Sequence, residues 1–292
     1  MLFREYEIWH DECKLNSFHH GVLFIPVDKK NSIINILKSI RDEYKISYDR
    51  DIKFSKSLKK EKKSRIVNNH LCLLSHLLKS NVKSKTPLFN VTGEVLYKRV
   101  YVPFLELLYA FDCKFGFLST EDYLRCFEGT YSRKIELTFK FILKSCCHSM
   151  FSNINPISIS KFYFDGHDHL GTDFDANYLS TISLRDYCKI SKPIEIDSRH
   201  IKERDDETLL IMNLVDNAVS SFTACISSSY DPYCTLKPFN DILSRVKKGL
   251  IFKNKNSEWY KTLSFSKVNV VNGSINFSDL FENKDQLVFD FY

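Results

Sequence analysis

The chain has 292 residues, enough to bury a substantial core as one large domain with additions or as two small domains. Hydrophobic residues make up 43% and charged residues 27%, values typical of soluble globular proteins, so the composition excludes a wholly disordered chain. The formal net charge of +6 suits a polyanionic partner but does not identify one.

The start of the chain and its cysteines indicate a compartment. The first residues (MLFREYEIWHDE) are charged, and the sequence has no run of about 18 apolar residues that could span a bilayer. We therefore expect a cytoplasmic protein with no membrane association. The nine cysteines form no repeated CxxC pattern, which favours free thiols over a disulfide framework or a cysteine-based zinc site.

The N-terminal part of the chain predicts a hairpin and two helices. Residues 3–10 alternate in polarity and residues 21–27 (GVLFIPV) are rich in β-formers, so the two predict paired strands. Apolar residues recur at helical spacing over 31–44. A short strand is expected over 51–54 (DIKF), followed by a helix over 59–79 with a basic first half and an apolar second half.

The start of the second helix concentrates positive charge. Such a run is either a contact surface for a nucleic-acid backbone or an ordinary solvated helix face. As candidate nucleic-acid-binding residues we take Lys56, Lys59, Lys60, Lys62, Lys63 and Arg65.

The middle of the chain alternates irregular and regular segments. Residues 81–130 contain several Pro and Gly residues and predict an irregular insertion of mixed strands and short helices. A long helix over 132–151, a strand over 159–165 that ends in an acid, a helix over 175–188 and a strand over 193–197 follow.

The C-terminal third predicts a helix over 208–226, another over 239–250, and a hairpin around Asn272 and Gly273. Strands interleaved with helices define an α/β class, in which acids at the carboxyl ends of strands point into a common crevice.

A polar seam runs along the predicted helix over 208–226. Its members are spaced to share one helix face, and they are short polar groups with one carboxylate: Asn213, Asp216, Asn217, Ser220 and Ser221. A solvated face usually carries Lys and Glu, so the seam indicates a face turned to a site; a thin polar edge that meets water is the alternative. A buried carboxylate there needs a metal or a cation; we favour metal, although a distant basic residue such as Lys53 could reach it.

Five short stretches carry a resemblance to a known family. They are HDEC at 10–13, IKFS at 52–55, FYFD at 162–165, EIDS at 195–198 and MNLVDNAV at 212–219. Their order resembles the domain of unknown function 3800 family, a group of the ribonuclease H-like superfamily. The chain departs from that pattern where Cys13 and Lys14 replace Ser-Gly, where Asn213 stands for Gln, and where Val215 stands for Ala.

The resemblance implies a fold and its boundaries. We expect a ribonuclease H-like mixed sheet flanked by helices over 1–230, interrupted by the insertion at about 81–130. Residues 231–292 would form a C-terminal extension packed on this core.

The resemblance also implies a site. Asp11, Asp165 and Asp216 would bind Mg²⁺ or Mn²⁺, because hard cations prefer oxygen ligands. Glu12 is a possible fourth acid, although neighbouring strand residues point to opposite faces, so we rank Asp11 first. Lys53 would neutralise the scissile phosphate or orient the nucleophile. Asn213, Asn217 and Ser220 would support these residues through hydrogen bonds.

The function implied is a two-metal nuclease acting on DNA or RNA, in a phage-defence or mobile-element system with a possible protein partner. The alternative is a catalytically inactive nucleic-acid-binding or protein-interaction module, since fold does not fix function. A nucleotide-hydrolysing enzyme is disfavoured because the sequence has no GxxxxGK[ST] loop.

Overall fold

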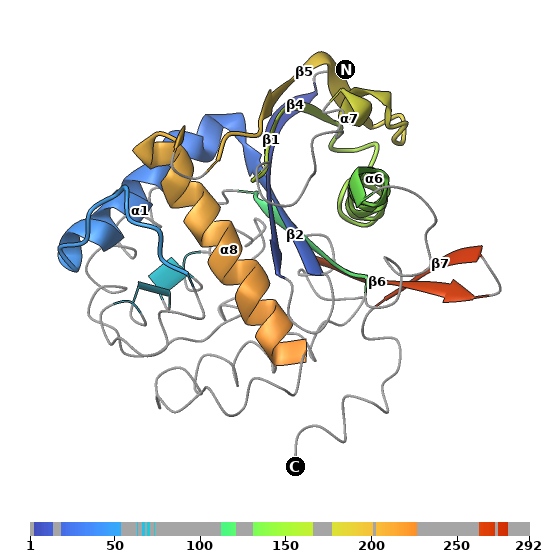
Figure 1. Cartoon of the computed structure of the whole chain (residues 1–292). Coiled ribbons are helices and arrows are strands. Elements are labelled where there is room, and N and C mark those ends of the chain that lie inside the picture. Colours follow the sequence, from blue (N-terminus) through green and yellow to red (C-terminus); the bar gives the residue numbers. More distant parts are fainter. Residues whose placement is uncertain are drawn as a thin grey trace.

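The chain forms an α/β structure in which helices cover both faces of one mixed sheet (Figure 1). This confirms the predicted α/β class and the predicted flanking helices. The computed structural model describes residues 3–13, 19–53, 63, 66–67, 69–70, 73, 112–120, 131–165, 177–200, 203–226, 263–271 and 274–279.

In the part of the chain that the structure describes, the sheet has seven strands in the order β5-β4-β1-β2-β3-β6-β7. The strands are β1 (Arg4–Cys13), β2 (His19–Pro26), β3 (Lys114–Ser119), β4 (Ile157–Tyr163), β5 (Cys188–Asp197), β6 (Leu263–Val271) and β7 (Ser274–Asp279). β1, β2 and β3 pair antiparallel in succession, and β4 and β5 continue the sheet in parallel beyond β1. On the other side β6 pairs parallel with β3 and antiparallel with β7.

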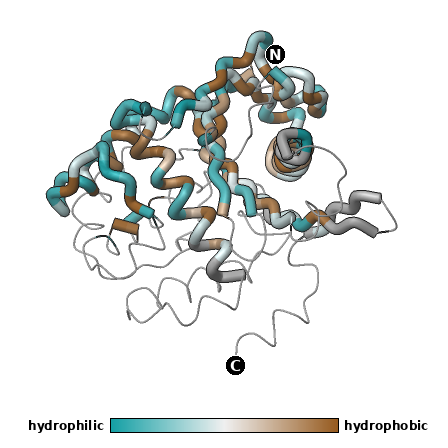
Figure 2. The backbone as a smooth tube through the Cα atoms, viewed as in Figure 1, coloured by the Kyte–Doolittle hydropathy of each residue, from teal (hydrophilic) through white to brown (hydrophobic). Residues whose placement is uncertain are grey.

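Two layers of helix enclose the central strands. α8 (Asp206–Ile226) lies on β1 and β2, and α1 (Lys30–Glu43) packs against α8 on the same side after a short 3-10 turn, η1 (Val27–Lys29). α6 (Tyr131–Met150) and the single-turn α7 (Tyr178–Thr181) cover the opposite face. In Figure 2 apolar residues are frequent along the central strands and α8, as expected for elements buried between layers.

Two glycines set how closely the helices approach the sheet. A Cβ atom on Gly21 of β2 would lie 2.2 Å from the Cγ2 atom of Val219 on α8. A Cβ atom on Gly116 of β3 would lie 2.0 Å from the Sγ atom of Cys146 on α6. Both contacts are far below van der Waals distance, so each helix touches the sheet backbone only because glycine stands there.

The structure differs from several sequence-based expectations. Residues 51–53 are not a strand. Among the described residues of the helix expected over 175–188, only Tyr178–Thr181 is helical, and Cys188 already belongs to β5. β3 falls inside the expected insertion at 81–130, yet it pairs with β2 within the main sheet. β6 and β7, in the expected extension at 231–292, also continue that sheet.

Other predicted elements agree with the structure or lie beyond it. The hairpin of β1 and β2, the helices α1, α6 and α8, and the antiparallel pairing of β6 with β7 are as predicted. The expected helix over 239–250 and the turn residues Asn272 and Gly273 lie outside the described residues. Within the described ranges, no helix combines the length and apolar character needed to cross a membrane.

Candidate functional site

A pocket opens where β1 and β4 end, beside α8. It is lined by His10, Asp11, Glu12, Asp51, Lys53, Phe139, Asp165, Arg204, Met212, Asn213 and Asp216. The three acids singled out from the sequence come from three distant segments, and all three line this pocket. Lys53 and Glu12 line it as well.

The pocket reaches both faces of the sheet because β1 extends beyond the end of its neighbour β4. The pairing of β4 with β1 ends at Trp9 and Tyr163, whereas β1 continues against β2 as far as Cys13. Asp11 lies opposite Gly21, which faces α8, and His10 packs edge-on against Phe139 of α6 at a ring-centroid distance of 4.7 Å. Alternation along β1 therefore sends Asp11 to the α8 face, and His10 and Glu12 to the α6 face.

Asp11 sits in a strongly unfavourable environment for a negative charge. Burial raises the pKa of its carboxyl well above the ordinary value, and the nearby carboxylate of Asp216 raises it further, with smaller contributions from Glu12 and Asp165. The backbone N–H of Glu12 donates to Asp11 Oδ1 at 2.7 Å and opposes the shift. Among the described lining residues, five carboxyl groups face two cations, Lys53 and Arg204.

Asp216 lies in a similar environment, buried and close to other carboxylates. Burial, and then the charge of Asp51, raise the pKa of Asp216 to about 6, while Lys53 and the hydroxyl of Ser220 act in the opposite direction. The Ser220 hydroxyl donates to Asp216 Oδ1 at 3.2 Å. Ser220 therefore has the supporting contact that the sequence led us to expect.

Among the residues that the structure describes, two aspartate oxygens of the pocket are buried with no hydrogen-bond donor. They are Oδ1 of Asp165 and Oδ2 of Asp216. A buried carboxylate oxygen with no partner is costly, on the order of a few kcal/mol. A divalent cation with a preference for oxygen ligands would remove this cost, so the donor set fits Mg²⁺ or Mn²⁺.

The two asparagines of the polar seam hold a distant piece of backbone. The N–H of Ile52 donates to Asn213 Oδ1 at 2.6 Å, and Asn217 Nδ2 donates to the carbonyl of Ile52 at 3.2 Å. Their amides thus replace the strand neighbour that residues 51–54 were expected to have. This clamp places Asp51 and Lys53, on either side of Ile52, at the pocket.

Lys53 is the half-exposed cation of the pocket, with its Nζ atom 3.7 Å from Asp51 Oδ2. Burial lowers the pKa of Lys53, but the surrounding carboxylates, led by Asp51 and Asp216, raise it by more, so the net shift is upward. Lys53 therefore remains charged at neutral pH.

Sequence reasoning missed two charged lining residues, Asp51 and Arg204. Arg204 is 8% exposed and donates to the carbonyl of Phe164 at 2.8 Å. Burial lowers the pKa of this guanidinium, and the charge of Asp165 is the largest opposing influence. Arg204 lies in the charged spacer after β5, where nothing in its spacing distinguishes it from its charged neighbours.

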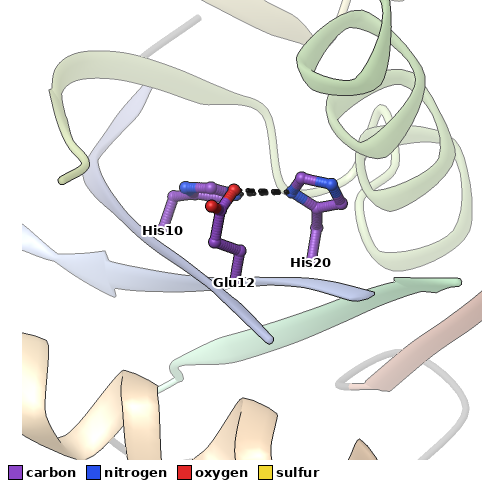
Figure 3. A group of neighbouring side chains, drawn as sticks. All are labelled: His10, Glu12 and His20. Atoms are coloured by element: carbon purple, nitrogen blue, oxygen red, sulfur yellow. Dashed lines mark hydrogen bonds and ion pairs between the residues drawn. The ribbon is translucent and has the colours of Figure 1, made fainter. Parts of the chain in front are cut away.

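His10, Glu12 and His20 form a group that could hold a metal ion on the α6 face (Figure 3). His10 Nε2 lies 3.0 Å from His20 Nδ1, and His20 Nδ1 lies 3.9 Å from Glu12 Oε2. Burial lowers the pKa of His10 to about 3, so its imidazole is neutral. Glu12 thus lies with two histidines, on the other face of the strand from Asp11, as strand geometry led us to expect.

Of the predicted nucleic-acid-binding residues, only one falls in the part of the chain that the structure describes. Lys63 is helical and half-buried, and the described residues that follow it are helical and buried: Ile66, Val67, Asn69, His70 and Leu73. The remaining basic residues lie outside the described ranges: Lys56, Lys59, Lys60, Lys62 and Arg65.

Comparisons of the chain with protein-family models, with curated proteins and with solved structures found no match.

Proposed function

We propose that this chain is a divalent-metal-dependent nuclease, with Asp11, Asp165 and Asp216 as the metal ligands and Mg²⁺ or Mn²⁺ as the ion. The observation that carries the proposal is the convergence of these three carboxylates on one pocket, two of them with a buried oxygen that has no donor among the described residues. Carboxylates held together against their mutual repulsion are typical of a cation site.

The sheet supports the ribonuclease H-like fold that the sequence resemblance implies. Three antiparallel strands in sequence order, β1 to β3, are extended beyond β1 by the parallel strands β4 and β5, each reached through a helix-containing connection. In this arrangement Asp11 lies on β1, and Asp165 lies two residues beyond the end of the parallel neighbour β4. The two acids are therefore adjacent in space although 154 positions, 165 minus 11, separate them.

The reaction assigned to this site is hydrolysis of a phosphodiester. A water oxygen forms a bond to phosphorus, the bond from phosphorus to the leaving sugar oxygen breaks, and a water proton ends on that oxygen. Divalent metal, when bound, supplies an activated water and stabilises charge on the leaving oxygen. Asp11, Asp165 and Asp216 would hold it, and Lys53 would place positive charge beside the phosphate.

The remaining pocket residues position these groups. The Asn213 and Asn217 clamp on Ile52 fixes the backbone on which Lys53 stands. Arg204 lies beside Asp165 and holds the carbonyl of Phe164, so it orders the segment that leaves β4. The basic residues over 56–65 supply the substrate-binding surface in this proposal.

A cleavage panel tests the proposal. Labelled single-stranded and double-stranded DNA, RNA and hybrids are incubated with the full chain and Mg²⁺, Mn²⁺ or EDTA. We expect metal-dependent cleavage that Asp216→Asn abolishes while the circular dichroism spectrum is unchanged. Asp186→Asn, a change at an exposed residue after α7, is the matched control and should retain activity.

Two outcomes would contradict the proposal. One is undiminished cleavage by Asp216→Asn. The other is nucleic-acid binding that is equal in Mn²⁺ and EDTA with no cleavage of any substrate, which would instead assign the chain to a binding module.

A further inference from the structure

The group on the α6 face arises from the register of the first hairpin. Glu12 lies directly opposite His20 in the β1 and β2 ladder, and His10 lies two residues earlier on the same strand. Residues two apart on a strand, and residues paired across a ladder, share one face of the sheet. The three side chains therefore converge because of backbone pairing (Figure 3).

The distances suit a shared ion. The ligand atoms of the three residues all lie within 4.8 Å of one another. Around a tetrahedral zinc ion with bonds of about 2.0–2.1 Å, ligand atoms are separated by about 3.3–3.4 Å. The nitrogen-to-nitrogen separation of 3.0 Å and the nitrogen-to-oxygen separation of 3.9 Å lie on either side of that value. Small side-chain rotations that move the ligand atoms by a few tenths of an ångström would accommodate the ion.

The donor set selects the kind of ion. Two imidazole nitrogens with one carboxylate suit Zn²⁺ and similar transition metals, whereas Mg²⁺ favours oxygen donors and retains its waters. The side chain of His20 is fully buried and that of Glu12 is 12% exposed, so solvent competes weakly for these donors. Three protein ligands leave one coordination position, and His10 and Glu12 both line the pocket.

We propose that His10, Glu12 and His20 form a transition-metal site of the zinc type, with its remaining coordination position open to the pocket. This site is separate from the carboxylate site, because Asp11 points to the opposite face of β1. It does not depend on the proposed nuclease activity. The competing explanation is a hydrogen bond between the two imidazoles with no metal involved.

Binding of Co²⁺ tests the proposal, because this ion replaces zinc and absorbs visible light when protein nitrogen and oxygen atoms bind it. The metal-free full chain is titrated with Co²⁺ in excess Mg²⁺, which occupies oxygen-only sites. We expect one equivalent of Co²⁺ with the intense bands of four- or five-coordinate geometry, and displacement by Zn²⁺. Absence of such bands in the wild-type chain would overturn the proposal and leave the imidazole hydrogen bond as the explanation.

Variants then locate the ion. Glu12→Gln and His20→Gln each remove one ligand and should weaken Co²⁺ binding by more than about tenfold. Loss of a residue that only hydrogen-bonds to a metal ligand already costs about tenfold or more in affinity, so loss of a ligand should cost at least as much. His148→Gln changes an exposed histidine on α6 and should bind Co²⁺ as the wild type does. Asp216→Asn should also retain the bands. Since His20 is fully buried, Glu12→Gln decides the matter if His20→Gln does not fold.

The reverse pattern would refute the site. Co²⁺ bands that persist in Glu12→Gln but disappear in Asp216→Asn would place the ion among the carboxylates. All readouts are spectroscopic, so failure of the nuclease proposal leaves this test unaffected.

Discussion

Removing the charge of Asp216 should stabilise the metal-free protein. The Asp216 carboxyl is buried beside other carboxylates, and its pKa is raised to about 6 from an ordinary value of 3.8. A group that binds its proton more tightly in the folded state contributes stability at low pH and loses it as pH rises. Ionised Asp216 is therefore a cost to folding at neutral pH, and Asp216→Asn removes that cost with little change in shape.

The size of the effect follows from the shift. The difference between about 6 and 3.8 is about 2 pH units, and each unit corresponds to about 1.4 kcal/mol. The upper bound is thus about 3 kcal/mol, and partial solvent access to Asp216 brings the expected gain to about 1–3 kcal/mol. The gain should be absent below about pH 4, grow between about pH 4 and 6, and remain constant above that.

Urea unfolding in EDTA measures this gain. Wild type, Asp216→Asn and the exposed control Asp186→Asn are compared at pH 4 and at pH 7.5, with the free energy of unfolding taken from linear extrapolation. We expect the Asn variant at position 216 to be the more stable only at pH 7.5. A variant that is less stable than wild type at pH 7.5, or a difference that is the same at both pH values, would refute the reasoning.

Three further predictions concern packing, the asparagine clamp and metal. Gly21→Ala should lower the free energy of unfolding by about 1–3 kcal/mol, because the added methyl overlaps Val219; an unchanged melting temperature would contradict the contact. Asn213→Ala removes the acceptor of the Ile52 N–H, so the free energy of unfolding should fall by about 1–3 kcal/mol and the cleavage rate should also fall. A variant with unchanged stability and unchanged cleavage would contradict the role of the clamp. Mn²⁺ at about 100 times its dissociation constant should stabilise the wild type by about 2.7 kcal/mol and Asp11→Asn by much less, as measured by thermal shift; equal shifts would place the ion elsewhere.

The elements that were predicted best from the sequence are those whose apolar residues follow a helical or alternating pattern. α1, α6 and α8 carry helical spacing over three or more turns, and the hairpin of β1 and β2 combines alternation with β-branched and aromatic residues. The polar seam of α8 was visible for the same reason, since it interrupts an otherwise apolar helix. Asp216 could be chosen from this local pattern alone.

The parts that could not be predicted depend on long-range contacts. Residues 51–53 alternate as a strand does, but the backbone of Ile52 is bonded by amide side chains 161 and 165 positions away. Local spacing in the sequence does not indicate such long-range bonds. The strand expected over 193–197 begins five residues earlier, at Cys188, because it pairs with β4 from Ile157 onward, and local spacing does not reveal that pairing. β3 was hidden in a segment rich in Gly and Pro, although its six residues are all buried between layers.

The histidine group shows how register decides a site. His10 and Glu12 are visible in the sequence as neighbours of Asp11, but the position of His20 depends on which β2 residue pairs with Glu12. The predicted second strand began at residue 21, one residue too late to include His20, whereas β2 begins at His19. A shift of one residue in that pairing would send His20 to the other face of the sheet.

The central claim is that Asp11, Asp165 and Asp216 share a divalent cation. X-ray diffraction from crystals of the chain soaked in Mn²⁺, collected at the manganese absorption edge, locates the ion directly. The account predicts an anomalous peak within bonding distance of all three carboxylates, and no such peak in Asp216→Asn crystals treated in the same way. A wild-type map with no peak between these side chains, at saturating Mn²⁺, would contradict it.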